Sequence, residues 1–448
     1  MFYRGIIDEL RKWANNPERK PLVLRGARQV GKTTVVDMFA DEFDQYIRLN
    51  LEIPQEQAIF EHAHPFKDFI AALFVRYKFK RDGVRTLIFI DEIQNSPKAV
   101  ALLRYFYEEA PDLYVIAAGS LLESIIDRHI SFPVGRVEYR VLHPVSFREF
   151  MAASGEDQAL AYLDAEEVPS FLHDHFSSLF KRFTTIGGMP QVVSSFIRFG
   201  DITRLQVIYE SLLRSYSEDV EKYVTGTPMI TYIRHILKTA FTEACNRITF
   251  ENFGNSSYRY REMKEAFSTL ERTLLMTLVY PGTETEIPAL PRLKMKPRLH
   301  LLDTGLANFS ANVVAHLLTS QDISDVYRGK IAEHIVGQEL MAMNYSISNQ
   351  LRFWVREKKQ SSAEVDYIFL HNGWLIPVEV KSGSIGKLRS LHQYMDQAPH
   401  RIAVRVWNGP RLVEKARTIA GTEFTLLNLP FYLVHRIDRE LSKLATNH

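Results

Sequence analysis

The sequence has little of what a secreted or membrane-spanning protein needs. Cys245 is the single cysteine among 448 residues, which excludes an internal disulfide framework and is typical of a reducing compartment. The longest uncharged apolar run, LYVIAAGSLL, is too short to span a bilayer. The first residues, MFYRGIIDELRKW, lack an apolar core followed by a small-residue cleavage site, which argues against a secretory signal. We therefore expect a cytoplasmic protein with no membrane partner.

An excess of either charge is also missing from the chain as a whole. Its 55 basic and 53 acidic residues leave a net charge of +2, which by itself predicts no partner. A hydrophobic content of 46% and a charged content of 24% are typical of a folded globular protein and exclude general disorder. The length of 448 residues indicates more than one domain.

Three changes of pattern divide the chain. Apolar strands alternate with amphipathic helices over residues 1–150, which predicts a parallel sheet with helices on both faces. Helical spacing of Leu, Phe and Tyr dominates residues 151–245. A shorter unit follows over residues 246–318. Residues 319–448 begin with a helix, YRGKIAEHIVGQELMAM, and continue with strands such as LRFWVRE, AEVDYIFL, WLIPVEVKS and RIAVRVWN.

The strongest motif is GARQVGKTT, which matches G-x-x-x-x-G-K-[ST] and lies between an apolar strand and a helix. Backbone N–H groups of such a loop bind phosphate at the helix N-terminus. Lys32 would reach the outer phosphates, and the hydroxyl of Thr33 would bind Mg²⁺. The nucleotide-binding residues predicted from this motif are Gly26, Ala27, Arg28, Gln29, Val30, Gly31, Lys32, Thr33 and Thr34.

A second motif, the acidic segment TLIFIDEIQ, completes the predicted nucleotide-hydrolysing site. Asp91 and Glu92 end an apolar strand, so Asp91 is expected to hold Mg²⁺ and Glu92 to activate the attacking water. Ser120 ends the strand LYVIAAGS and is a candidate polar sensor, or else a helix cap. Arg136 is a candidate arginine finger, or else a structural arginine. These residues predict ATP and Mg²⁺ as cofactors.

The two nucleotide motifs, together with GSLLES, GRVEYRVLHPVSFREF and GGMPQVV, resemble the bacterial and archaeal AAA-type P-loop ATPases that carry a C-terminal domain of unknown function. The resemblance covers nearly the whole chain. It implies that residues 1–150 form the ATPase domain and residues 151–245 a helical lid. It also implies that Pro190 packs on the adenine, although a simple helix break explains this proline equally well.

A second candidate site lies near the C-terminus. Glu379 and Lys381 are two residues apart on one strand, so their side chains share a face. The turn signal HNG separates this strand from the one containing Asp366, which predicts a hairpin that brings Asp366 close to Glu379. Glu333, on the preceding helix, is expected to face the same sheet. A plain ion pair between Glu379 and Lys381 is the alternative explanation.

This order of residues resembles the PD-(D/E)XK nuclease core, so residues 319–448 are expected to form an α/β restriction-endonuclease-like domain. The resemblance implies that Glu333, Asp366 and Glu379 hold Mg²⁺ and that Lys381 positions or deprotonates water. Residues 351–417 carry twelve Lys or Arg and six Asp or Glu, a net charge of +6 that would attract DNA or RNA. A solvated surface is the alternative explanation of these charges.

The unit at 246–318 contains RLKMKPRLH, in which basic and apolar residues alternate. This alternation predicts one strand with Arg292, Lys294, Lys296 and Arg298 on the same face, as in the wing of a winged-helix module. A plain scaffold between the lid and the C-terminal domain is the alternative.

The sequence thus predicts an α/β protein that hydrolyses ATP with Mg²⁺ and whose nuclease-like C-terminal domain acts on or binds nucleic acid. The competing hypothesis is an ATP-driven signalling switch with a catalytically inactive C-terminal module that binds protein or DNA. The sequence leaves the oligomeric state open.

Overall fold

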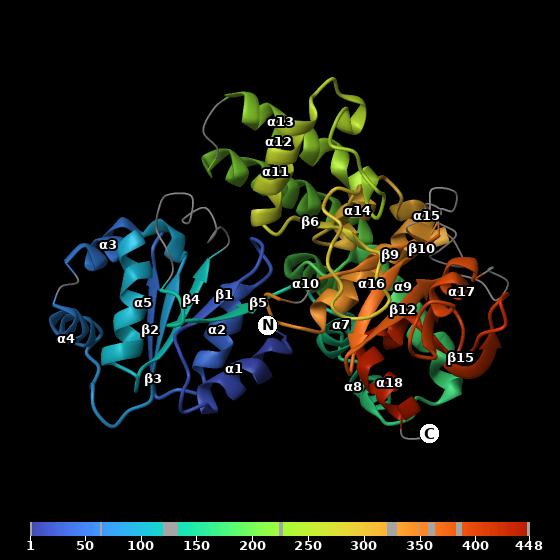
Figure 1. The fold of residues 1–448 in the computed structure, drawn as a ribbon. Coiled ribbons are helices and arrows are strands. Elements are labelled where there is room, and N and C mark those ends of the chain that lie inside the picture. Colours follow the sequence, from blue (N-terminus) through green and yellow to red (C-terminus); the bar gives the residue numbers. More distant parts are fainter. Residues whose placement is uncertain are drawn as a thin grey trace. The chain divides into compact units, whose positions relative to one another are not determined.

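The computed structural model describes residues 2–62, 65–119, 133–223, 227–319, 329–348, 350–356, 363–381 and 388–445 (Figure 1). The chain divides into two units. The N-terminal unit comprises Met1–His143, Arg272–Leu275 and Tyr345–Ser348, and the C-terminal unit comprises Pro144–Glu271, Met276–Asn344 and Asn349–His448.

A five-stranded parallel sheet forms the centre of the N-terminal unit. Its strand order is β2-β3-β4-β1-β5, so the first strand lies between the fourth and the fifth. Ligands of such sheets bind at the carboxyl ends of the strands, near the point where the strand order changes direction. The strands are β1 (Leu22–Arg25), β2 (Gln45–Asn50), β3 (Thr86–Asp91), β4 (Tyr114–Gly119) and β5 (Glu138–Val141).

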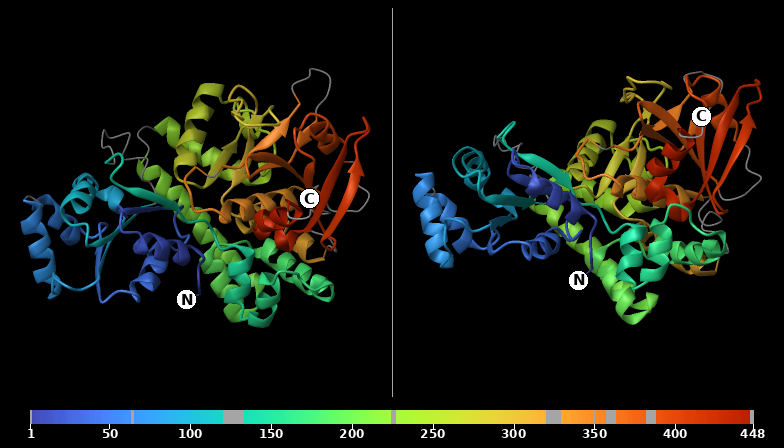
Figure 2. Two further views of the ribbon diagram at one scale, coloured as in Figure 1. Left: turned by 60° about the horizontal axis from the view of Figure 1, so that its bottom comes forward. Right: turned by 90° about the horizontal axis from the view of Figure 1, so that it is seen from below.

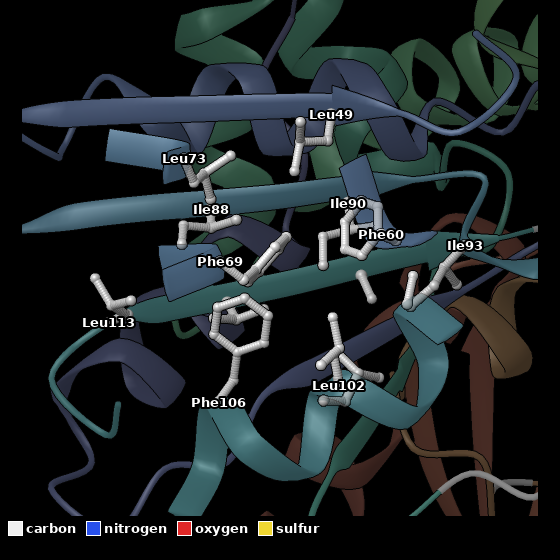
Figure 3. Packing of buried hydrophobic residues seen from close by; sticks show 14 of the residues in the cluster. Leu49, Phe60, Phe69, Leu73, Ile88, Ile90, Ile93, Leu102, Phe106 and Leu113 are labelled. Carbon is white, nitrogen blue, oxygen red and sulfur yellow. The ribbon is translucent and has the colours of Figure 1, made fainter. Parts of the chain in front are cut away.

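Helices cover this sheet as the alternating pattern predicts. Phe69 of α4 and Leu102 and Phe106 of α5 pack against Ile88 and Ile90 of strand β3 (Figure 3). This cluster is fully apolar, and its burial supplies the main driving force for folding this unit. The helices are α1 (Ile6–Asn15), α2 (Lys32–Ala40), α3 (Pro54–Gln57), α4 (Phe66–Tyr77) and α5 (Pro97–Glu109).

The C-terminal unit begins with helices, as the helical spacing after residue 150 predicts. Ser146 caps the first of them by accepting a hydrogen bond from the Glu149 N–H, while the Glu149 side chain accepts from the Ser146 N–H. The helices are α7 (Phe147–Ala153), α8 (Asp157–Asp164), α9 (His173–Ile186), α10 (Pro190–Phe199), α11 (Leu205–Tyr223), α12 (Thr227–Thr239), α13 (Tyr260–Arg272), α14 (Thr304–Ser310) and α15 (Val314–Thr319).

A mixed five-stranded sheet of order β11-β12-β13-β15-β14 forms the last part of this unit, with the long helix α16 (Lys330–Ala342) before it. Its strands, orange to red, appear from two further directions in Figure 2. They are β11 (Tyr367–His371), β12 (Trp374–Val380), β13 (Ile402–Trp407), β14 (Leu412–Arg417) and β15 (Glu423–Pro430), with helices α17 (Arg389–Met395) and α18 (Ile437–Ala445). The α/β fold class that the sequence predicts is therefore confirmed.

One local prediction is wrong. Residues 292–297 form no strand, and the strand β8 (Arg298–Leu301) begins only after Pro297 and pairs with β6 (Met276–Val279). Proline cannot donate to a strand ladder, which explains the late start. The alternating basic residues therefore do not share a strand face. Arg292 instead pairs with Glu284 at 2.8 Å, while Arg298 is buried.

A further small sheet of order β10-β9-β7 completes the unit, built from β7 (Pro281–Gly282), β9 (Phe353–Val355) and β10 (Glu364–Val365). The domain boundaries at residues 150, 245 and 318 stay predictions. Across the described ranges, every helix is too short or too polar to cross a bilayer.

Candidate functional site

The loop between β1 and α2 has the backbone shape that a phosphate-binding loop needs. Gln29 and Gly31 have φ angles of 64° and 96°, both in the left-handed region. Gly26 lies so close to the chain that a Cβ atom there would be 2.7 Å from the carbonyl oxygen of Leu142, so only glycine fits. Since α2 begins at Lys32, the free N–H groups of its first turn face the end of this loop.

Lys32 lies buried inside the loop. Its Nζ donates to the carbonyl oxygens of Gly26 and Ala27, both at 2.9 Å. Burial lowers the pKa of Lys32 to about 8, although the nearby carboxylates of Glu92 and Asp91 oppose this shift. The loop therefore holds an ammonium group at low dielectric, where a phosphate anion would be a strong partner.

Thr33 and Asp91 meet at the carboxyl edge of the sheet. The Oγ1 of Thr33 donates to Oδ2 of Asp91 at 2.7 Å, although the two residues are 58 positions apart. Burial raises the pKa of Asp91 despite this hydrogen bond. A hydroxyl and a carboxylate side by side are oxygen ligands of the kind that Mg²⁺ prefers, so this pair fits the predicted cation.

Glu92 follows directly and has a φ of 52°, an uncommon conformation for a non-glycine residue. Strained backbone of this kind is concentrated at functional sites. The Nε2 of Gln94 donates to Oε2 of Glu92 at 2.5 Å, which fixes the direction of the carboxylate. Glu92 is thus placed one residue beyond Asp91, as a water-activating group would need to be.

Two residues beside this site escaped the sequence analysis. Gln94 belongs to the quoted segment TLIFIDEIQ, but its contact with Glu92 depends on the turn that Glu92 makes. Arg48, on β2, has Nη2 4.0 Å from Oδ2 of Asp91 and Nη1 3.1 Å from Oδ2 of Asp37. Since β2 and β3 are parallel neighbours, the sheet order would have revealed Arg48.

Of the three weaker nucleotide-site candidates, the structure describes Arg136 and Pro190. Ser120 lies outside the described residues. The Nε of Arg136 lies 2.9 Å from Oε1 of Glu108, an ion pair that matches the structural alternative. Pro190 is the first residue of α10 in the C-terminal unit, where a proline is favoured because its missing N–H would have no helical partner. Roles for these three residues in nucleotide chemistry stay predictions.

The C-terminal acids do converge within their own unit. β11 and β12 pair antiparallel, with Tyr367 opposite Val378, and Oδ2 of Asp366 accepts the N–H of Val380 at 2.8 Å. The Nζ of Lys381 lies 3.0 Å from Oε1 of Glu379. The hairpin and the shared face that the sequence predicts are therefore both present.

Glu333, on α16, belongs to the same cluster. The hydroxyl of Tyr367 donates to the backbone oxygen of Glu333 at 2.7 Å, which ties α16 to β11. Burial raises the pKa of Glu379 to about 8, and the charges of Asp366 and Glu333 add to the shift. Burial and the charge of Asp366 also raise the pKa of Glu333. Three carboxyl groups therefore share one poorly solvated site.

Each of these acids has a protein partner already. The Nζ of Lys330 lies 3.0 Å from Oε2 of Glu333, and Lys381 and Arg298 approach Glu379 and Asp366. Among the described residues, no group of three His, Cys, Asp or Glu side chains is arranged to hold a metal ion. The arrangement does not fit a preformed Mg²⁺ site, so we derive no metal-dependent step from it.

The GGMP segment has a structural role that the sequence analysis missed. Gly188 donates its N–H to Oδ2 of Asp303 at 2.5 Å, and Leu306 donates to Oδ1 at 3.0 Å. Gly187 has a φ of 68°, and a Cβ there would be 2.4 Å from Oδ1 of Asp303. Burial raises the pKa of Asp303 to about 6. The two glycines thus let the backbone close around a buried carboxylate.

Side chains of helix α16 make further buried hydrogen bonds near Asp303. The Oε1 of Gln338 accepts the N–H of Thr304 at 2.8 Å, and the Thr304 hydroxyl lies 2.8 Å from Nδ1 of His334. Oε1 of Glu339 accepts the N–H of Phe147 at 2.9 Å. We call the set Phe147, Gly188, Asp303, Thr304, His334, Gln338 and Glu339 the buried polar seam. Within the C-terminal unit, it joins α7, the turn between α9 and α10, the start of α14, and α16.

The seam makes stability depend on pH. Burial raises the pKa of Glu339 to about 8, so the folded chain keeps a proton that the unfolded chain loses above its ordinary pKa near 4.5. Stability should therefore fall as the pH rises from about 4.5 to 8, by up to about 1.4 kcal/mol per pH unit for this group. Glu339→Gln keeps the acceptor for Phe147 and should flatten this slope in urea unfolding at several pH values. Exposed Glu167→Gln should keep the wild-type profile, and a Glu339→Gln slope equal to wild type would refute the assignment.

Comparisons with known proteins agree with the N-terminal geometry. Residues 18–151 match a family model described as an AAA domain, and residues 177–316 and 328–430 match two models described as domains of unknown function, DUF8612 and DUF4143. No curated protein matches the chain. The N-terminal unit thus contains a P-loop domain of the AAA type, as its motifs predict.

Solved structures include two that are similar to this chain. The Walker-type ATPase PABY2304 of Pyrococcus abyssi has 16% sequence identity and a TM-score of 0.44, over 69% of this chain and 96% of that chain. PCH-2 of C. elegans has 11% identity and a TM-score of 0.28, over 44% of this chain and 62% of that chain.

Proposed function

We propose that the chain binds and hydrolyses ATP with Mg²⁺ in its N-terminal unit and binds nucleic acid through its C-terminal unit. The observation that supports the first half best is the meeting of Thr33 and Asp91 at 2.7 Å beside the buried Lys32. These residues come from two separate motifs, and the matching AAA-domain model spans both of them. Such a combination favours phosphoryl transfer over simple anion binding.

Each residue has a distinct task in this proposal. The N–H groups of the loop and the ammonium of Lys32 bind the outer phosphates, while Thr33 and Asp91 hold the cation. Mg²⁺, when bound with ATP, neutralises charge on the phosphate oxygens. Glu92 orients or deprotonates the attacking water, and Gln94 keeps the Glu92 carboxylate in position.

The nucleic-acid half of the proposal depends on exposed cations of the C-terminal sheet. Lys415 and Arg417 are exposed and two residues apart on the edge strand β14, so their side chains share one face. Lys415 donates a hydrogen bond to Thr425 Oγ1 and Arg417 donates one to the backbone oxygen of Gly421, and both acceptors are neutral. The two charges therefore remain available to phosphate groups, which attract cations without sequence preference.

Fluorescence anisotropy at several salt concentrations tests this half. Labelled single-stranded DNA, duplex DNA and RNA should bind with an affinity that falls steeply as salt rises. The double variant Lys415→Ala/Arg417→Ala should weaken binding and make the slope of log K against log salt shallower by about 1.5–2. Lys12→Ala/Lys98→Ala, which removes two exposed lysines of the N-terminal unit, should leave both values unchanged.

The same experiment distinguishes nucleic-acid binding from the competing hypothesis of an ATP-driven switch. If none of the three nucleic acids binds in a salt-dependent way, the C-terminal unit is better explained as a protein-binding module of an ATP-driven switch. If nucleic acid does bind, the absence of a preformed three-ligand metal group among the described residues favours binding without cleavage.

A further inference from the structure

The acidic cluster of the C-terminal unit contains an arginine that none of the motifs predicted as part of it. Arg298 is 4% exposed and lies on β8, far in sequence from the acids it meets. Its Nη1 donates to the backbone oxygen of Asp366 at 2.8 Å, and its Nη2 pairs with Oε1 of Glu364 and lies 3.8 Å from Oδ1 of Asp366. The guanidinium thus faces two carboxylates at once.

The backbone holds Arg298 firmly in this place. Arg298 pairs with Val279 of β6 and forms an isolated bridge with Arg247. Its guanidinium also lies over the ring of Phe353, 4.6 Å from the centroid. Since the backbone is paired on both sides and the guanidinium is packed on an aromatic face, the side chain cannot leave the cluster without losing its contacts with Phe353, Glu364 and Asp366.

Charges balance within the cluster when all of its acids are ionised. Its four carboxylates are Glu333, Glu364, Asp366 and Glu379, and the four cations that pair with them are Arg247, Arg298, Lys330 and Lys381. The only buried acid oxygen in this set without a hydrogen-bond partner is Oε2 of Glu379. Mg²⁺ needs a near-octahedral shell of oxygen atoms, so it would have to displace these cations from the carboxylates before it could bind.

We propose that Arg298 is the resident counter-cation of Asp366 and Glu364 in this cluster and neutralises them in place of a divalent metal ion. A fixed guanidinium offsets part of the negative charge of these two acids whether or not a dissociable cation is present. The acids and Lys381 then serve as a neutral, rigid platform and not as a metal-dependent cleavage site. This inference does not depend on ATP binding.

Divalent-metal binding tests the proposal directly, without nucleotide or nucleic acid. Mn²⁺ is titrated into the full chain carrying Asp91→Asn, which removes the carboxylate of the nucleotide site, and binding is followed by calorimetry and electron paramagnetic resonance. We expect no saturable site below millimolar Mn²⁺. Adding Arg298→Met leaves the buried carboxylates without their counter-cation, so one Mn²⁺ should bind at least about tenfold more tightly.

Two further variants identify the site. Adding Asp366→Asn to the Arg298→Met chain should abolish the new site, because Asp366 is one of the acids that Arg298 contacts. Arg292→Met, which removes an arginine paired with Glu284 outside the cluster, should create none. Arg298→Met should also lower the unfolding temperature, and Mn²⁺ should raise it again. If Arg298→Met folds only with Mn²⁺ present, that rescue supports the proposal.

Two results would overturn the inference. One is a saturable Mn²⁺ site in the chain that retains Arg298, provided that Asp366→Asn removes it. The other is an Arg298→Met chain that neither binds Mn²⁺ more tightly nor gains thermal stability from it. The first result is measured only on chains that retain Arg298, so it tests the inference even if the Arg298→Met chain is unstable.

Discussion

Replacing Lys32 by alanine is expected to weaken ATP binding about a hundredfold or more, because the buried ammonium is the main positive charge facing the outer phosphates. Fluorescent-nucleotide binding or calorimetry with Mg²⁺ measures the loss. The structure adds a second consequence. Lys32 also satisfies the carbonyl oxygens of Gly26 and Ala27, so its removal should cost about 1–3 kcal/mol of stability.

Controls separate these two effects. Lys98→Ala removes an exposed lysine of the same unit, paired with Glu61, and should leave nucleotide affinity unchanged. Circular dichroism and thermal unfolding show whether the Lys32→Ala chain is folded under the assay conditions. A folded Lys32→Ala chain with wild-type affinity for ATP would mean that the phosphates bind elsewhere.

Replacing Glu92 by glutamine should leave ATP bound and lower turnover about 10²–10⁴-fold, the usual contribution of a general base. Glutamine keeps the shape of the side chain but cannot take a proton from water. Phosphate release under saturating ATP measures turnover, and the same titration as for Lys32 measures binding. Wild-type turnover in the Glu92→Gln chain would remove Glu92 from the catalytic role.

Gln94→Ala provides a graded comparison. Its amide donates to Oε2 of Glu92 at 2.5 Å and does not itself act on the phosphates in the proposed mechanism. Turnover should therefore fall less than in Glu92→Gln, with little change in ATP affinity. Equal losses in the two variants would place Gln94 itself at the reacting groups.

Much of the nucleotide site could be predicted from the sequence because its chemistry depends on short local motifs. The loop 26–34 lies between a strand and a helix, and Asp91 ends a buried strand, so both must reach the carboxyl edge of a parallel sheet. Their contact at 2.7 Å follows from this topology. The hairpin that pairs Asp366 with the Glu379 strand was predictable for the same reason, since a short turn sets its register.

Features that depend on long-range contacts could not be predicted. Arg298 alternates with apolar residues like an exposed strand residue, yet its burial depends on carboxylates 66 and 68 positions away. Strand β8 begins only after Pro297, so the alternation of basic and apolar residues across this proline does not indicate one continuous strand. The strands β14 and β15 were not among the predicted elements, although the apolar run in EFTLLNLP is a strand signal.

The segments that carry the family resemblance are explained in part by the buried polar seam. GGMP supplies the N–H group that binds Asp303, and HPVSFREF supplies Phe147, whose N–H binds Glu339. Within the C-terminal unit, these contacts join α7 to α16 and the turn between α9 and α10 to the start of α14. These motifs therefore have a structural role in packing the C-terminal unit. A motif match alone does not distinguish this role from a contact with nucleotide.

Calorimetric titration of ATP with Mg²⁺, near pH 8 and in two buffers of different ionisation enthalpy, tests the central claim most directly. We predict saturable binding of one ATP per chain with uptake of a fraction of a proton, because the phosphates raise the pKa of Lys32 from about 8. Asp91→Asn should weaken this binding only when Mg²⁺ is present. A folded wild-type chain that gives no saturable heat would contradict the account.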